Sequence, residues 1–297
     1  MSQVEGPPWY ATHPDGKLWL GGVPDRLLRH SGLKCRGIVL NSALKPGVVF
    51  RTYRSQLTEP AYVVKVLDLS TEELPIYERL LRDIHCPANH TLPCEILRSE
   101  DHPLLIMPLL GDLLPFISIV TTSLSQGIEY LHKLHIAHLD FCEGNTLVAY
   151  PEDAACHNTV VVNRVYIIDF DTARQFALGP GSQRAITLPE TQVAPPDGST
   201  RFDPYSWDVY CLGRLFEQLL KAHYRNIGES PWLLRQYIKW LIGKERGCSG
   251  VCKCRPSATA ARRILVVLGW VSPLIEAFSR VAQFFFRSHS TRPPTRL

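Results

Sequence analysis

The sequence predicts an α+β fold in which a small sheet-bearing part precedes a larger helical part. Short apolar stretches typical of strands are concentrated before about residue 110, whereas the long stretches with helical spacing follow it. The 297 residues are enough for two lobes with a sizeable core. Hydrophobic residues make up 45% and charged residues 20% of the chain, which argues against a mainly disordered protein.

The first half of the chain is expected to form an arm, a small sheet and one helix. Residues 1–30 are rich in Pro, Gly and Trp without periodicity, so we expect a loose arm. Strand-like stretches follow at Gly37–Leu40, Gly47–Tyr53, Ala61–Leu67 and Leu104–Leu110. A helix is predicted over Ser70–Asp83, because its apolar residues recur on one face: Ile76, Tyr77, Leu80 and Leu81.

The second half is expected to be mostly helical. The longest helix is predicted over Pro115–His135, where Leu124, Ile128 and Leu131 follow helical spacing. Short strands are expected after it, at Thr146–Ala149, Val160–Val162 and Val165–Phe170. Residues 172–207 are rich in turn-forming residues, and two further helices are predicted at Trp207–His223 and Trp232–Ile242.

No membrane-spanning segment or export signal is predicted. The longest uncharged stretches, Leu113–Ile128 and Ile264–Ile275, contain too few apolar residues to cross a bilayer, which takes about 20. The N-terminus lacks the basic and then apolar pattern of a signal peptide. Nine cysteines without such a signal are typical of reduced thiols, so we expect an intracellular protein, cytoplasmic or nuclear.

The C-terminal region is basic, since residues 221–297 contain 14 Lys or Arg and 3 Asp or Glu. Nothing else in the sequence indicates nucleic-acid binding, and we expect this charge to serve solubility. Residues 268–297 are predicted to form a basic amphipathic tail with one apolar helical face: Leu274, Phe278, Val281 and Phe285. We expect this face to dock on the helical part of the chain. The alternative is weak contact with an anionic membrane surface.

Two strings of polar residues combine the side chains that phosphoryl transfer needs. His138, Asp140 and Asn145 follow the longest predicted helix, and Asp169 with Asp171 follows a predicted strand. One aspartate can orient the proton of an attacking hydroxyl, while the asparagine and the second aspartate hold a divalent metal ion. Each string alone is weak evidence, but their order along the chain favours this chemistry.

These strings resemble motifs of the eukaryotic-type protein kinase family, and the resemblance extends over about Val39–Leu265. His138, Asp140 and Asn145 resemble the catalytic loop of that family, and the stretch Asp169–Asp171 resembles its metal-binding DFG motif. Lys65 resembles the lysine of its third strand. Two later stretches, Trp207–Gly213 and Cys254–Ala258, resemble motifs that small-molecule phosphotransferases usually lack.

The resemblance implies a bilobal fold with ATP and Mg²⁺ between the lobes. The N-lobe would occupy residues 31–108 and the C-lobe residues 109–267. Asp140 would be the catalytic carboxylate, and Asn145 and Asp169 would bind the metal. The implied nucleotide-binding residues are Lys65, Glu73, Gly47, Val49 and Met107, with Pro108–Leu110 as the hinge between lobes. The implied structural residues are His138, Asp208, whose carboxylate braces the catalytic loop, and Arg255.

The carboxylate that pairs with Lys65 is open between two glutamates. Glu73 precedes the apolar residues Ile76, Tyr77 and Leu80, a pattern that resembles the family's helix with the ion-pairing glutamate. However, Glu73 is only eight residues from Lys65. Glu78 has a more comfortable spacing and a poorer apolar pattern. We prefer Glu73.

Several positions depart from the family pattern. In the expected glycine-rich loop, Asn41–Val49, only Gly47 and Val49 match, and side chains there would keep backbone amides away from a phosphate. Four further substitutions remove or reverse charges that the family normally has: Leu139 for Arg, Cys142 for Lys, Asp171 for Gly and Pro196 for Glu. The last of these would leave Arg255 without its usual partner.

The sequence therefore predicts a protein-kinase-like enzyme that transfers the γ-phosphate of ATP to a Ser or Thr hydroxyl of a protein substrate. Two alternatives remain. One is a pseudokinase that binds a nucleotide or a partner without turnover, and the other is a small-molecule kinase. Cys248, Cys252 and Cys254 offer three ligands where zinc prefers four, so the sequence does not favour a zinc site there.

Overall fold

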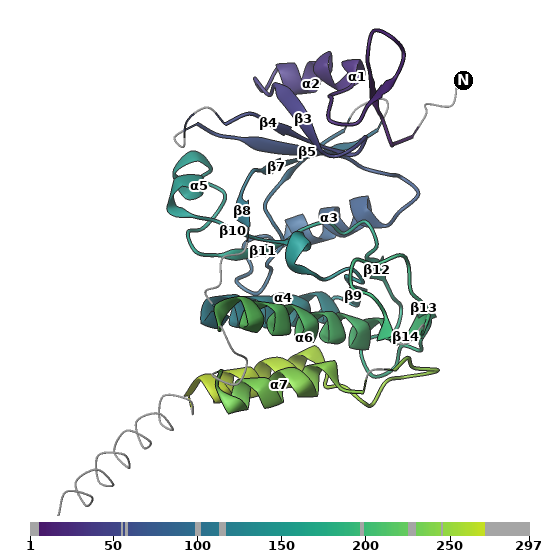
Figure 1. The fold of residues 1–297 in the computed structure, drawn as a ribbon, viewed down its shortest axis with the longest axis vertical. Coiled ribbons are helices and arrows are strands. Elements are labelled where there is room, and N and C mark those ends of the chain that lie inside the picture. The colour runs from purple at the N-terminus through teal and green to yellow at the C-terminus, as the bar shows by residue number, and fades with distance from the viewer. Residues whose placement is uncertain are drawn as a thin grey trace, which may run out of the picture.

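In the computed structural model, residues 6–270 are described except 55, 57–58, 99–101, 113–116, 197–198, 225–229 and 245. The fold is mixed, as the sequence predicts: a five-stranded sheet near the N-terminus is followed by a helical part (Figure 1). We call residues 6–108 the sheet-bearing part and residues 109–270 the helical part. The amphipathic pattern at 274–285, with nearly all of the predicted tail, lies outside the described residues.

The main sheet is antiparallel with the strand order β3-β4-β5-β7-β6. Its strands are β3 (Leu40–Lys45), β4 (Val49–Thr52), β5 (Tyr62–Val66), β6 (Glu95–Leu97) and β7 (Leu104–Pro108). Successive side chains of a strand point to opposite faces, so Val64 and Val66 of β5 enter one apolar cluster, whereas Val63 enters the other. Lys65 shares the face of Val63, and this alternation directs its ammonium toward the helical part.

The outer face of the sheet is covered by the N-terminal residues. Strands β1 (Ala11–Thr12) and β2 (Leu18–Trp19) pair with each other, and α1 (Asp25–Leu28) and α2 (Ser31–Lys34) lie on the sheet (Figure 1). Trp9, Leu27 and Leu33 are buried there with apolar side chains of the strands. The expectation of a loose arm over residues 1–30 is therefore wrong for residues 6–30, because its scattered apolar residues form a core without a regular period.

The first strand also begins later than expected. Gly37 has φ +67° and ends α2 in a turn, with Ile38 N donating to Leu33 O at 3.0 Å. That turn occupies most of the predicted strand Gly37–Leu40, so β3 begins only at Leu40. Strands β4, β5 and β7 and the helix α3 (Glu73–Arg82) fall within three residues of their predicted bounds, whereas the short strand β6 was not predicted. Ile76, Tyr77 and Leu80 of α3 are fully buried, as their spacing predicts.

The helical part is built on α4 (Ile117–Lys133), α6 (Pro204–His223) and α7 (Trp232–Ile242), followed by a helical stretch over 258–270. The helix α6 begins three residues before the prediction, because Asp203 caps it: Asp203 Oδ1 accepts from the backbone nitrogens of Tyr205 and Ser206. Gly213 lets α6 and α7 approach closely, since a Cβ there would lie 3.0 Å from Leu241 Cβ.

In the part of the chain described, no helix combines the length and apolar character needed to cross a bilayer.

Short strands and turns complete the helical part. One small sheet contains three strands, β8 (Gly111–Asp112), β10 (Thr146–Val148) and β11 (Val165–Ile167). Two further sheets contain two strands each. One pairs β9 (Ile136–Ala137) with β12 (Arg174–Gln175), and the other pairs β13 (Ile186–Thr187) with β14 (Arg201–Phe202). A 3₁₀ turn (Glu143–Asn145) precedes β10, and the helix α5 (Pro151–Cys156), which the sequence did not predict, follows it. The predicted strand Val160–Val162 is wrong: Val161 and Val162 are exposed, and Asn163, with φ +61°, turns the chain there.

Candidate functional site

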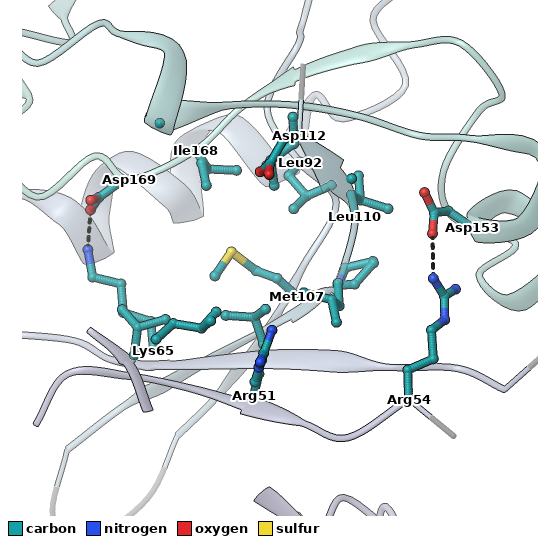
Figure 2. Close-up of a pocket in the computed structure, with 18 of the residues that line it drawn as sticks. Arg51, Arg54, Lys65, Leu92, Met107, Leu110, Asp112, Asp153, Ile168 and Asp169 are labelled. Carbon is teal, nitrogen blue, oxygen red and sulfur yellow. Dashed lines mark hydrogen bonds and ion pairs between the residues drawn. The ribbon is translucent and has the colours of Figure 1, made fainter. Parts of the chain in front are cut away.

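A cavity of about 560 Å³ lies between the main sheet and the small sheet of β8, β10 and β11 (Figure 2). Val63 and Met107 line it from the main sheet, and Leu147 and Ile168 line it from the opposite side. Its two ends are polar. Lys65 and Asp169 face each other at one end, and an ion pair between Arg54 and Asp153 of α5 spans the other, with an N–O distance of 3.1 Å. The cavity thus combines apolar walls with charged ends.

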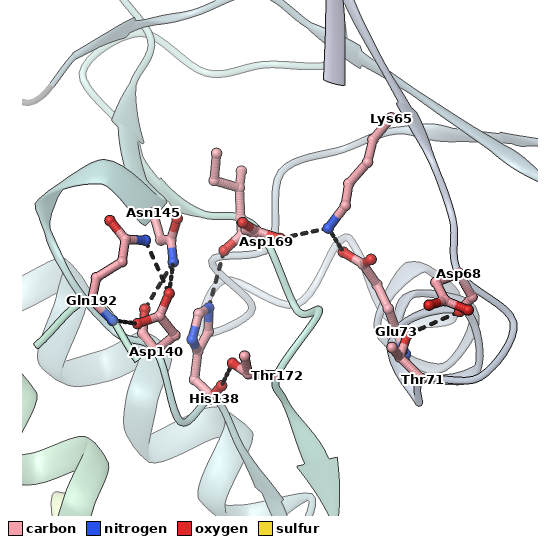
Figure 3. Close-up of polar contacts among 11 residues, drawn as sticks. Lys65, Asp68, Thr71, Glu73, His138, Asp140, Asn145, Asp169, Thr172 and Gln192 are labelled. Atoms are coloured by element: carbon pink, nitrogen blue, oxygen red, sulfur yellow. Dashed lines mark hydrogen bonds and ion pairs between the residues drawn. The ribbon is translucent and has the colours of Figure 1, made fainter. Parts of the chain in front are cut away.

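Lys65 is bonded to two carboxylates at the inner end of this cavity (Figure 3). Its Nζ lies 2.7 Å from Glu73 Oε1 and 2.5 Å from Asp169 Oδ1. Lys65 is 3% exposed and Glu73 is fully buried, so solvent screens the Lys65–Glu73 pair only weakly. The structure thereby joins β5, α3 and the residues after β11 through a single ammonium group.

Burial affects the two carboxylates of this triad differently. Burial raises the pKa of Glu73 to about 7, although the ammonium of Lys65 acts in the opposite direction. Burial also acts to raise the pKa of Asp169, but the charge of Lys65, its hydrogen bond and the nearby Lys45 and His138 together outweigh burial, and the pKa is lowered. Asp169 is therefore the stronger acid of the two, and its carboxylate is the one that remains available as an anionic ligand at neutral pH.

The structure answers which glutamate pairs with Lys65. Glu73 does, and Glu78, which is partly exposed one and a half turns further along α3, is instead paired with Arg98. The short spacing from Lys65 is accommodated because Asp68–Glu72 forms a tight turn, in which Thr71 Oγ1 donates to Asp68 O at 3.0 Å, directly before the helix. The preference for Glu73 is confirmed.

Asp140 and Asn145 also meet, next to a residue that the sequence did not indicate. Asn145 Nδ2 donates to the backbone oxygen of Asp140 at 2.8 Å and to its Oδ2 at 3.1 Å. Gln192 donates twice to the same carboxylate, from its backbone nitrogen to Oδ1 at 2.6 Å and from Nε2 to Oδ2 at 2.9 Å (Figure 3). Both oxygens of Asp140 are therefore occupied by donors from within the chain.

A fully buried carboxylate, Asp208 of α6, holds the backbone of this loop. Its Oδ1 accepts from the backbone nitrogen of Leu139 at 2.8 Å, and its Oδ2 accepts from the backbone nitrogen of His138, also at 2.8 Å. The ring of His132 lies 2.9 Å from the same Oδ2. Trp207 Nε1 donates to Leu139 O at 2.7 Å, which adds a further tie to α6. These bonds hold Leu139 at φ +67°, a conformation that non-glycine residues rarely adopt.

His138 connects this loop to the residues around Asp169. Its Nε2 lies 3.0 Å from Ile168 O, and its ring packs against Phe170 with the ring centroids 5.1 Å apart. Phe170 in turn contacts Tyr77 of α3 edge to face. Asp169, whose φ is +62°, thus lies between the partly buried Ile168 and the fully buried Phe170. The structural role expected for His138 agrees with these contacts.

The hairpin of β3 and β4 covers the cavity in place of a glycine-rich loop. Val49 and Leu44 line the cavity, and Gly47, with φ +75°, lies in the turn between the strands. Trp9 N donates to Gly47 O at 2.8 Å, and a Cβ at Gly47 would lie 2.7 Å from Pro8 Cβ. The turn is therefore held by the N-terminal segment, and the lack of a side chain at Gly47 permits this close approach.

Arg255 is buried without an acidic partner among the residues described, as its sequence context predicts. Its guanidinium donates to the backbone oxygens of Ile242 and Lys244, both at 2.7 Å, and to Ser206 Oγ at 3.3 Å. It also lies over the ring of Tyr210. Arg255 thus ties the end of α7, through two carbonyl groups, to the beginning of α6, through the hydroxyl of Ser206.

Two sets of site residues were missed from the sequence. Gln192 lies in a turn-rich segment with no motif of its own, so only the fold shows its contact with Asp140. Arg51 and Arg54 line the cavity from β4 and the residues after it. The alternation of β4 could have indicated Arg51, since Phe50 and Thr52 are buried on the other face.

Comparison with known proteins does not identify the chain. No protein-family model matches it, and no curated protein matches it. Its chemistry must therefore be inferred from the site.

Proposed function

We propose that the chain is an ATP-dependent phosphotransferase with a bilobal, protein-kinase-like fold, which transfers the γ-phosphate to a Ser or Thr hydroxyl of a protein. One observation supports this function above the others. Lys65 is bonded at the same time to Glu73 of α3 and to Asp169, at the inner end of a cavity with apolar walls. A buried lysine oriented by one glutamate beside a second, stronger acid is the arrangement that protein kinases use to bind phosphate and metal.

The cavity fits a nucleotide in size and in the order of its surfaces. Val49, Val63, Met107 and Leu147 offer apolar contacts for a planar base. The ammonium of Lys65 lies deeper, where it can exchange its bond with Asp169 for bonds to phosphate oxygens while Glu73 keeps it in place. Arg51, whose side chain also lines the cavity, adds positive charge on the side of the hairpin.

The residues present also fit Mg²⁺, which prefers carboxylate and carboxamide oxygens. Asp169 would supply an ionised carboxylate. Asn145 uses Nδ2 on Asp140, and its Oδ1 would be the ligand atom on the opposite side of the amide. When bound, Mg²⁺ neutralises the negative charge that phosphoryl transfer develops on the phosphate oxygens.

In this proposal Asp140 orients the acceptor hydroxyl and accepts its proton. Asn145 fixes the carboxylate from one side, and Asp208 holds the backbone that presents it. Cys142 replaces a positive charge near the transferred group, and burial raises the pKa of its thiol to about 11, so it adds no negative charge there. The positive charge near the transferred phosphate would come from Lys65 and the metal ion, with Arg51 on the side of the hairpin.

One observation favours a second candidate, a pseudokinase that binds a nucleotide without turnover. Gln192 donates to both oxygens of Asp140, so an incoming hydroxyl would have to compete with these bonds for the carboxylate in this conformation. We rank the pseudokinase second, because the chain has all four of the side chains that phosphoryl transfer requires: Lys65, Asp140, Asn145 and Asp169.

Substitution of the catalytic carboxylate tests the proposed function. Transfer of labelled γ-phosphate from Mg-ATP to a generic protein substrate should fall by about 10²–10⁴-fold in Asp140→Asn, because removal of a positioned general base costs about that much. The exposed carboxylate of α1 provides the control, and Asp25→Asn should leave the rate unchanged. Equal rates for Asp140→Asn and the parent would contradict the proposal. Binding of Mg-ATP without transfer by the parent would favour the pseudokinase.

A further inference from the structure

The fold brings three cysteines together in the loop between α7 and the helical stretch 258–270. The Sγ atoms of Cys248, Cys252 and Cys254 all lie within 4.8 Å of one another, and those of Cys252 and Cys254 are 3.0 Å apart. A tetrahedral zinc ion with Zn–S bonds of about 2.3 Å holds its sulfur ligands about 3.8 Å apart. The sulfur–sulfur distances of the three thiols therefore span the distance found in a zinc–thiolate site. Rotation of the cysteine side chains alone can bring the sulfur atoms to that distance.

The backbone of this loop is fixed independently of any ion. Cys248 N donates to Arg201 O at 3.0 Å, and Cys252 N donates to Asp203 Oδ2, also at 3.0 Å. Gly247 N donates to Ser199 Oγ at 3.1 Å. The loop is thus attached at several points to the segment 199–203, which precedes α6. A ligand set on a loop held in this way loses little further conformational freedom when it binds an ion.

The surroundings favour a negatively charged metal–thiolate complex. The thiols line an open hollow of about 1000 Å³, separate from the nucleotide cavity. Four of the described residues that line it are basic, Arg201, Lys244, Arg246 and Lys253, and none of them is acidic. A divalent ion with three thiolates has a net charge of −1, which these side chains stabilise.

We propose that Cys248, Cys252 and Cys254 form a zinc site with a solvent molecule as the fourth ligand. Thiolates select soft ions such as zinc over magnesium or calcium. Among the residues described, no His, Asp or Glu joins the three thiols, and the open hollow leaves room for water at the fourth position. Binding releases the three thiol protons to solvent. The ion fastens the loop of residues 246–254 to the beginning of α6 and so stabilises the helical part, independently of phosphotransfer.

A cobalt titration of the reduced, full-length protein tests this site. Co²⁺ bound by thiolates gives an intense sulfur-to-metal absorption band in the near ultraviolet, which Zn²⁺ should abolish by displacement at one equivalent per chain. Cys248→Ser, Cys252→Ser and Cys254→Ser should each weaken binding by at least about 100-fold, since each removes a ligand. Cys35→Ser is the matched control, because Cys35 is an exposed free cysteine outside the loop, and it should bind as the parent does.

Zinc should also raise the melting temperature of the parent and of Cys35→Ser, but not that of the three loop variants. These variants are expected to fold, because the bonds that attach the loop to the segment 199–203 are donated by backbone nitrogens and do not involve the thiols. The proposal is overturned if the parent shows no thiolate–cobalt band, or if the band survives in the loop variants. It is also overturned if two of the three cysteines form a disulfide in protein purified under reducing conditions.

Discussion

The loop of residues 138–145 and the hairpin of β3 and β4 reach the same cavity from opposite sides, but they are fixed in different ways. The loop is held from the side of α6 by the buried carboxylate of Asp208, which binds two backbone amides and the ring of His132. The turn of the hairpin is held from outside by Trp9, through one backbone hydrogen bond, and by contact with Pro8. The loop carries the residues of the proposed chemistry, whereas the hairpin contains one glycine, Gly47.

This difference indicates which groups bind phosphate in the proposed enzyme. A glycine-rich hairpin would offer backbone amides, whereas this hairpin presents the side chains of Leu44, Val49 and Arg51 to the cavity. The phosphates would then depend on Lys65 and on the metal ligands of the opposite side. Substitutions in the loop should therefore have large effects on stability and transfer, and those in the hairpin small ones.

The largest effect is expected for Asp208→Ala. The change removes the acceptor of two buried backbone amides and of His132, and we expect the free energy of unfolding to fall by about 3–5 kcal/mol. Urea unfolding of the variant and the parent measures this difference. Asp208→Asn is the matched control, since it keeps one oxygen acceptor and should lose less. A loss below about 1 kcal/mol in Asp208→Ala would show that the loop is held by other contacts.

A smaller effect is expected for Gln192→Ala, which removes the side-chain donor to Asp140 but keeps the backbone donor. A hydrogen bond to a charged group contributes about 1.5–3 kcal/mol, so its loss should free Asp140 and raise the rate of phosphate transfer by about 10-fold or more. Initial rates with Mg-ATP and a generic protein substrate measure the change. Gln183→Ala, on the same segment but bonded to Arg184 O, is the control. A fall in rate would mean that Gln192 positions Asp140 rather than blocks it.

The smallest effect is expected in the hairpin. Gly47→Ala places a Cβ 2.7 Å from Pro8 Cβ at a residue with φ +75°, so we expect a loss of about 1–2 kcal/mol in the free energy of unfolding. Gly16→Ala has the same backbone strain, φ +83°, with nothing within 4 Å of the added atom, and its loss should be smaller. Equal losses, measured by urea unfolding, would show that the N-terminal segment does not hold the turn.

The sequence predicted the parts of the site that depend on local periodicity. The alternation of β5 directs Lys65 to the inner face, and the apolar stripe of α3 brings Glu73 opposite it. The contact of Gln192 with Asp140 joins residues 52 positions apart and follows no period. The same holds for Trp9, whose packing on the sheet depends on a tertiary contact within a segment that has no regular pattern. The three cysteines were visible in the sequence, but their mutual distances depend on the path of the loop.

The most direct test of the account is the binding of Mg-ATP to the parent and to Lys65→Met. A ligand at 100 times its dissociation constant stabilises the native state by about 2.7 kcal/mol, so the melting temperature of the parent should rise by on the order of 5 °C. Lys65→Met should lose most of this rise, measured from its own baseline, whereas Lys17→Met, an exposed lysine of the N-terminal segment, should keep it. An unchanged melting temperature for the parent at millimolar Mg-ATP, or an equal rise in Lys65→Met, would contradict the nucleotide site.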